Sequence, residues 1–445
     1  MKRILFFCLV IIYSLCFFGC TADFFGNHRL IDVKYFDVSN AEALVLRENN
    51  NAKSIYSRLF RINERSSFSQ SDVYKIVDDN LEKILIKNTD LEILSNINLD
   101  FEFVKYLTED YFWARILQDQ TEEYDMFYWD VLCNSKTGEV HTLFNVLDNK
   151  IGYILLDRPI KLVDNYLYFS MDSYGYDFSS PNGIYRVDIS NPNKIKIKKP
   201  WINGNFNGDS YDLYVISDSG AILYTAEDSS IHIKFPNGED ILYDSNISGA
   251  VGQNFTSFGE DFISLDKNEK LFIDVDMQNS SYAQKTFICS DVSKILSIGQ
   301  SWYLIGDSRI PGNNDISKYF FNIYDITGIK QNLTDFESKT IDSSFEIYTF
   351  DAVAFSTSKI LFNVIYKNGN KNNELICYDV NTNESCTIPN SDEYSYESLE
   401  SLDNRVILSA TRKSDFQKVL LSCDGEKIKE LYETETSKLS ICAIN

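Results

Sequence analysis

The chain has 445 residues, of which 44% are hydrophobic and 14% aromatic, so it is long enough to bury a large core. Its 65 acidic residues outnumber the 42 basic ones, which gives a net charge of −23. A surface this acidic repels nucleic acid and anionic lipid headgroups, so we expect no nucleic-acid binding.

The N-terminus has the three parts of a secretion signal. Lys2 and Arg3 form a short basic region, the apolar run extends from Ile4 to Phe18, and the small residue Gly19 precedes Cys20. The apolar run is shorter than the roughly 20 residues that a membrane-spanning helix needs. We therefore favour a cleaved signal over an anchor helix, and an ordinary signal peptide is the alternative.

The Gly19-Cys20 pair resembles the lipobox of bacterial lipoproteins. The resemblance implies cleavage before Cys20 and acyl chains on that cysteine, with the membrane as a partner through this lipid anchor. It divides the chain into a signal peptide (1–19), a lipidated cysteine with a short tether (20–29) and a body (30–445). The expected location is the bacterial cell envelope, outside the cytoplasm, on the periplasmic face or the cell surface. Loss of Lys2 and Arg3 changes the net charge from −23 to −25.

The body shows the short apolar runs and Asn, Asp, Ser and Gly turns of an all-β protein. Residues 72–85 fit two strands joined at 78–80, and the alternating Lys and Ile of 194–199 fit a solvated strand face. One pattern recurs, in which an apolar strand ends in Asp or a turn pair and a second short strand follows. Its eight copies are residues 73–78, 126–130, 184–188, 231–235, 271–276, 321–325, 375–379 and 419–424.

These hairpins recur roughly every 40 to 58 residues, which is near the period of propeller blades. Two further strands precede most of them, for example 166–170 and 221–225, and four strands per period make one blade. Segments 165–170 and 182–188 look like the blades of bacterial secreted and lipoprotein β-propellers. We predict a β-propeller of four-stranded blades, with eight blades favoured and seven as the alternative. A pair of β-sandwich domains is the rival architecture.

Six cysteines follow Cys20, and an exported compartment permits disulfides between them. Cys377 and Cys386 lie on either side of the turn-like segment 381–383, so a hairpin would place them opposite each other. The hairpin therefore permits a cross-strand disulfide between them, and two free, half-buried thiols are the other interpretation.

Residues with catalytic chemistry are sparse in this chain. The three histidines, His28, His141 and His232, are isolated in sequence, and no zinc spacing or G-x-S-x-G motif occurs. We expect His141 and His232 to be ordinary strand residues, and we expect no cofactor. The loop with Asn203, Asn205, Asn207 and Asp209 offers oxygen ligands at alternate positions, as calcium prefers, but departs from the EF-hand pattern. We interpret it as an Asn/Gly-rich loop, so we expect no metal.

Three aromatic residues in expected loops are candidates for ligand or partner binding: Trp201, Tyr174 and Tyr176. Packing between blades is the alternative role for them. We expect a membrane-anchored envelope lipoprotein whose propeller is a platform for protein–protein contacts with an envelope partner. The alternative is a hydrolase or carbohydrate-binding protein that uses an axial pocket lined by paired carboxylates.

Overall fold

The computed structural model describes most of the chain after the first 32 residues. The described ranges are 33–49, 70–87, 99–118, 127–145, 153–154, 159–172, 182–197, 199–204, 214–243, 251, 255–264, 270–287, 294–309, 319–333, 338–343, 347–366, 373–435 and 437–443. Cys20, His28, Tyr174, Tyr176, Asn205, Asn207 and Asp209 lie outside them. No helix within these ranges is both long and apolar enough to cross a bilayer.

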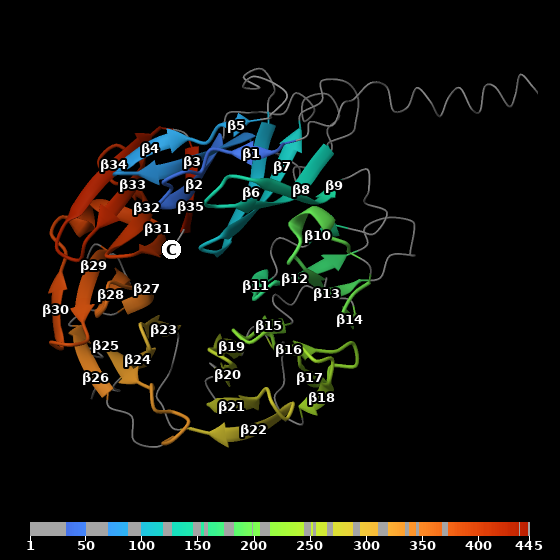
Figure 1. Cartoon of the computed structure of the whole chain (residues 1–445). Coiled ribbons are helices and arrows are strands. Elements are labelled where there is room, and N and C mark those ends of the chain that lie inside the picture. Colours follow the sequence, from blue (N-terminus) through green and yellow to red (C-terminus); the bar gives the residue numbers. More distant parts are fainter. Residues whose placement is uncertain are drawn as a thin grey trace, which may run out of the picture.

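The described strands form eight antiparallel sheets arranged as blades around a central axis, and one separate two-stranded sheet (Figure 1). Within each blade the strands follow one another from the innermost, at the axis, to the outermost, at the rim. Blade 1 contains, in this order, β35 (Ser437–Ala443), β2 (Ala43–Asn49), β3 (Gln70–Val77) and β4 (Asn80–Lys83), and blade 2 contains β6 (Leu99–Thr108), β7 (Tyr111–Gln118), β8 (Phe127–Asn134) and β9 (Val140–Asn145). In blade 3, β10 (Tyr153–Ile154) and β11 (Lys161–Val163) both pair with β12 (Tyr166–Asp172), followed by β13 (Gly183–Asp188) and β14 (Ile202–Asn203).

The remaining blades follow in chain order. Blade 4 contains β15 (Tyr214–Ile216), β16 (Ile222–Thr225), β17 (Ile231–Lys234) and β18 (Asp240–Tyr243), and blade 5 contains β19 (Phe255–Phe258), β20 (Asp261–Ser264), β21 (Leu271–Asp276) and β22 (Ser281–Thr286). Blade 6 contains β23 (Lys294–Ile298), β24 (Ser301–Arg309), β25 (Tyr319–Asp325) and β26 (Ser338–Ser343). Blade 7 contains β27 (Ile347–Phe355), β28 (Lys359–Tyr366), β29 (Glu374–Asp379) and β30 (Glu384–Thr387), and blade 8 contains β31 (Tyr394–Leu402), β32 (Arg405–Arg412), β33 (Lys418–Cys423) and β34 (Ile428–Thr434).

The ring is closed by the C-terminal strand. β35 pairs with β2 from the start of the body, in the register Leu44↔Cys442, so blade 1 contains both ends of the propeller. This closure and the eight sheets confirm the predicted eight-bladed propeller and exclude the seven-bladed and sandwich alternatives. All eight recurring hairpins in the sequence fall on the third strand of a blade.

The turn after the third strand explains the recurring acidic residue. In seven blades an Asp or Asn side-chain oxygen in this turn accepts a hydrogen bond from the backbone N–H two residues later, which fixes a tight Asx turn. The seven residues are Asn134, Asp188, Asn237, Asp276, Asp325, Asp379 and Asp424.

The hydrophobic core lies between the blades, in eight clusters that match the eight contacts between neighbouring blades. Successive side chains of a strand point to opposite faces of its sheet. In β32, for example, Val406 and Leu408 pack against blade 7, whereas Ile407 packs against blade 1. Each strand therefore needs apolar residues on both faces, and this is why the chain is so rich in continuous apolar runs.

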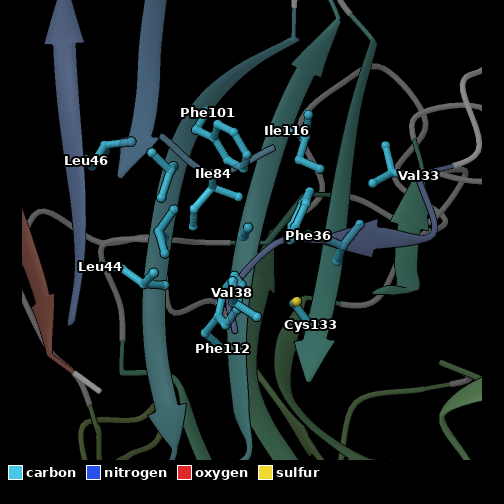
Figure 2. Packing of buried hydrophobic residues seen from close by; sticks show 14 of the residues in the cluster. Val33, Phe36, Val38, Leu44, Leu46, Ile84, Phe101, Phe112, Ile116 and Cys133 are labelled. Atoms are coloured by element: carbon cyan, nitrogen blue, oxygen red, sulfur yellow. The ribbon is translucent and has the colours of Figure 1, made fainter. Parts of the chain in front are cut away.

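An N-terminal arm reinforces the contact between blades 1 and 2. β1 (Tyr35–Phe36) pairs with β5 (Ile86–Lys87), and Phe36 N donates to Gly138 O at 2.7 Å. Figure 2 shows Val33, Phe36 and Val38 of this arm packed among residues of both blades. The arm thus lies between blades 1 and 2.

Two expectations about strands were wrong. Residues 194–199 form no strand in their described part, because Lys194 ends a short 3-10 turn (Pro192–Lys194) and no ladder follows. Ile195 and Ile197 instead pack against the core between blades 2 and 3. In blade 2, Asp130 lies inside β8 rather than at its end, and Asn134 ends the strand and accepts the hydrogen bond of the turn.

Candidate functional site

The innermost strands of blades 6, 7 and 8 lie next to one another around the axis of the ring (Figure 1), and charged side chains on these strands interact with one another. Lys294 on β23 forms an ion pair with Asp351 on β27, and Asp351 Oδ1 also accepts the N–H of Ala352 at 2.8 Å. Glu400 on β31 interacts electrostatically with both groups. Burial raises the pKa of Glu400, while Lys294 opposes this shift and Asp351 adds to it.

This axial array continues into blades 1 and 2. The Cys442 thiol on β35 donates to Val104 O at 2.8 Å, and burial raises the pKa of this thiol to about 12. Glu400 adds to that shift, and Lys105 on β6 opposes it. Five consecutive blades thus contribute ionisable groups, which we call the axial array: Lys294, Asp351, Glu400, Cys442 and Lys105.

The axial array provides paired carboxyl groups beside ammonium groups. A carboxyl with a raised pKa retains its proton to a higher pH than usual, as a general acid must. The array also suits a small polar ligand bound through hydrogen bonds and charge. No group of three or more His, Cys, Asp or Glu side chains within the described residues has the arrangement of a metal site.

A second polar cluster lies on blade 4. Ser230 Oγ is 2.9 Å from His232 Nε2, and His232 Nδ1 is 3.1 Å from Asp240 Oδ1. Tyr224 donates its hydroxyl to Asp240 Oδ2 at 2.9 Å, and Lys234 Nζ lies 3.3 Å from the same oxygen. The order Ser–His–Asp is that of a hydrolase triad.

The surroundings of this cluster favour a structural role. Ser230 Oγ also hydrogen-bonds to Asp228, whose carboxylate would oppose the negative charge that develops in acyl transfer. The bonds of Asp240 join β18, the outermost strand, to β17 and β16. We therefore interpret the cluster as a set of structural hydrogen bonds that stabilises the outermost strand of blade 4. His232 lies in a strand, as the sequence predicts, and so does His141 on β9.

Trp201 lies between blades 3 and 4, beside the apolar core of that contact. Its ring meets the edge of Tyr168 with the centroids 5.9 Å apart, and the guanidinium of Arg186 lies 5.3 Å from the indole centroid. The same guanidinium is 3.7 Å from the ring of Tyr166. These contacts give Trp201 a packing role, while ligand binding by it remains a prediction.

The other candidates divide between described and undescribed residues. Asn203 ends β14 and is exposed, and the other residues of the calcium candidate lie outside the described part of the chain. Cys377 and Cys386 are directly opposite each other in β29 and β30, as the hairpin predicts, and their sulfurs are free thiols in the structure.

Two features were missed by the sequence analysis. One is the buried ion pair of blade 2, in which Arg115 binds both oxygens of Asp130 at 2.9 Å while Trp113 Nε1 donates to the same carboxylate at 3.0 Å. The other is Phe416, a residue that is 78% exposed at the tip of the β32–β33 hairpin. The Ser414-Asp415 pair before Phe416 is a turn signal from which this hairpin tip could have been predicted.

Comparisons with solved structures find matches of low sequence identity. Apo AztD from Citrobacter koseri matches with 11% identity and a TM-score of 0.41, covering 91% of this chain and 99% of that one. The β-propeller domain of the Trilobed protease from Pyrococcus furiosus matches with 11% identity and a TM-score of 0.36, covering 74% of this chain and 82% of that one. An acylaminoacyl peptidase from Pyrococcus horikoshii matches with 13% identity and a TM-score of 0.35, covering 74% of this chain and 45% of that one.

These likenesses concern the fold alone. No protein-family model and no curated protein sequence matches the chain. The arrangement of its own sheets defines the chain as an all-β, eight-bladed propeller, a fold that by itself implies no function.

Proposed function

We propose that this protein is a lipid-anchored propeller of the bacterial envelope that serves as a platform for protein–protein contacts. The observation that carries the proposal is Phe416, an exposed aromatic residue that the backbone presents in an unfavourable conformation. Exposed aromatic side chains beside basic residues are typical of the small set of contacts that dominate binding at protein interfaces.

The backbone of Phe416 is left-handed, with a φ of 61°. Eleven non-glycine residues in the described part of the chain have positive φ, and the other ten are Asn, Asp or Ser. Small polar residues tolerate this region, whereas a bulky side chain costs roughly 1–2 kcal/mol there. Because Phe416 is 78% exposed, packing within the chain offsets little of this cost. A role in binding accounts for a residue that the fold itself disfavours.

The hairpin around Phe416 is held firmly at its base. Phe416 N donates to Arg412 O at 2.9 Å, and Arg412 forms ion pairs with Asp415, Glu430 and Glu433. The Lys413 ammonium donates to the backbone of Asp392 at 2.8 Å. A tip fixed in this way loses little conformational freedom on binding, so a partner with an apolar pocket would gain most of the contact energy.

The anchor part of the proposal rests on the lipobox-like sequence and the length of the tether. Val33, where the arm enters the core, is the thirteenth residue after Cys20. Thirteen extended residues span at most about 45 Å, so a lipid on Cys20 would keep the ring close to the membrane. A rigid ring held there is suited to meeting other envelope proteins.

The test uses the full-length protein in its native envelope. A photo-crosslinking residue is placed at exposed Ser414, in the natural chain and in a Phe416→Asn chain, with the same probe at Asn383 as the control. Asn383 is another exposed turn residue with positive φ. We expect one protein adduct from position 414 that weakens at least tenfold with Phe416→Asn and is absent at position 383. Adducts with lipid alone, or protein adducts that do not depend on Phe416, would refute the platform.

Lipidation is tested separately by metabolic labelling with an alkyne fatty acid. We expect label on the natural chain and none on Cys20→Ser, because the thioether linkage needs the cysteine sulfur. Label that persists in Cys20→Ser would refute lipidation at Cys20, and it would not affect the crosslinking result at Phe416.

The axial array favours a second candidate, in which the ring binds a small polar ligand such as a sugar. Glu400, whose pKa is raised by burial, and Asp351 supply the paired carboxyls that this function needs. The measurement is glycan-array binding of the natural protein and of Glu400→Gln. Loss of glycan binding in Glu400→Gln would support this function, and the absence of glycan binding by the natural chain would refute it.

A further inference from the structure

Two thiols face each other across the outer hairpin of blade 7. Cys377 on β29 and Cys386 on β30 are direct partners in the antiparallel register. Directly opposed residues in such a pair have Cα atoms about 4.5–5.5 Å apart, within the roughly 4.4–6.8 Å that a disulfide spans. Their side chains lie on the same face of the sheet, so a bond between the sulfurs needs no change of register.

A third thiol approaches the pair from blade 8. Cys423 on β33 interacts electrostatically with both Cys377 and Cys386. Gly425, in the turn that follows β33, leaves room for these sulfurs. A Cβ at this glycine would lie 3.0 Å from Cys377 Sγ, and Cys386 Sγ is 3.9 Å from Gly425 O. The thiols therefore converge at the contact between blades 7 and 8.

The thiols differ in their access to solvent. Cys386 is exposed, whereas Cys377 and Cys423 are buried. We propose that Cys377 and Cys386 are a redox modification site, at which an external disulfide oxidises the two thiols to a cross-strand disulfide. The oxidant is a protein disulfide or a low-molecular-weight disulfide, and the site is independent of the Phe416 platform.

The reaction is two successive thiol–disulfide exchanges. The Cys386 thiolate attacks one sulfur of the external disulfide, forming a mixed disulfide and releasing one external thiolate. The Cys377 thiolate then attacks Cys386 Sγ and releases the second external thiolate. Two protein thiols lose two electrons and two protons, and the external disulfide gains them as two thiols.

The second exchange sets the speed of closure. Burial raises the pKa of the Cys377 thiol to about 12, Cys386 adds to this shift, and Lys359 opposes it. Because only the thiolate attacks, the rate of closure should rise about tenfold per pH unit between pH 7 and pH 10. Replacing the ammonium with Lys359→Gln should slow closure further.

The bond would fasten the edge of blade 7. All four residues of β30 are exposed, and this strand pairs only with β29 within the described residues. Oxidation would hold β30 in place, and reduction would release an edge able to open. Exposed disulfides are the reducible ones, so the state of the site can follow the redox state of its surroundings.

The test is thiol mapping of the full-length protein, with free thiols alkylated under acid quench and no reductant. Trypsin leaves both cysteines on one peptide, so digestion after Glu384 is used to separate them. After incubation with oxidised glutathione at pH 7 to pH 10, we expect a Cys377–Cys386 linked pair whose formation accelerates with pH. Cys133 is the matched control, because it is a buried thiol on a third strand and faces Val140.

Three results would overturn the proposal. The first is Cys377 still fully alkylated after oxidation, with only a mixed disulfide on Cys386. The second is a bond from either cysteine to Cys423, and the third is equal oxidation of Cys133. As a further check, hydrogen exchange of β30 should slow on oxidation in the natural chain and stay unchanged in Cys386→Ser.

Discussion

Replacing Phe416 with Asn should stabilise the protein. The left-handed backbone at this position costs a bulky residue roughly 1–2 kcal/mol, and Asn avoids much of that cost. About a fifth of the Phe416 surface is buried, so the substitution also loses about 0.5 kcal/mol of hydrophobic contact. The free energy of unfolding should therefore rise by about 0.5–1 kcal/mol.

The assay is urea unfolding monitored by tryptophan fluorescence, with Phe416→Val as the matched comparison. Valine is also apolar, but its branched Cβ tolerates positive φ poorly, so this variant should be no more stable than the natural chain. If Phe416→Asn were destabilised by 1 kcal/mol or more, the ring would have to make contacts that hold the fold. That result would remove the argument that the fold disfavours Phe416.

Three further predictions concern the stability of the ring. Asp130→Asn should cost about 3–5 kcal/mol in urea unfolding, because it leaves Arg115 charged and buried, and a loss below 1 kcal/mol would contradict this. Hydrogen bonds from Ser190 and Asn279 hold the pKa values of Asp188 and Asp276 below the ordinary 3.8. Their stabilising effect is present above that value and is lost as the pH falls through the lowered pKa values. Acid unfolding curves of the two Asp→Asn variants should therefore be flatter than that of the natural chain below pH 3.8, and parallel curves would be evidence against it. Leu439→Ala on the closing strand β35 should cost about 2–4 kcal/mol and lower the melting temperature, and an unchanged melting temperature would show that closure contributes little.

Much of the fold could be read from the sequence because its signals are local. A third strand such as 375–379 combines an apolar run with an Asp whose side chain closes the next turn, and both features act within a few residues. Repetition of this unit gave the blade count. Asp130 shows the limit of the pattern, since a buried carboxylate inside a strand and one that caps a turn look alike until Arg115 is placed beside it.

The alternating Lys and Ile of residues 194–199 show a second limit. Alternation predicts that one side of a segment is buried, which is true of Ile195 and Ile197. It does not provide a neighbouring strand, and without one the segment forms no ladder.

The pairing of Cys377 with Cys386 could be predicted from the sequence because a short turn joins their strands.

The sequence by itself determined the all-β class, the blade repeat, the tight turns and the lipobox-like start, because each depends on neighbours along the chain. Only the tertiary structure brought Lys294, Asp351 and Glu400 together at the axis and Cys423 to the thiol pair, and only it showed that Phe416 stays exposed with positive φ. The ion pair between Lys294 and Asp351 joins residues 57 positions apart. Such contacts depend on how the blades close into a ring, and that closure is decided by packing over the whole chain.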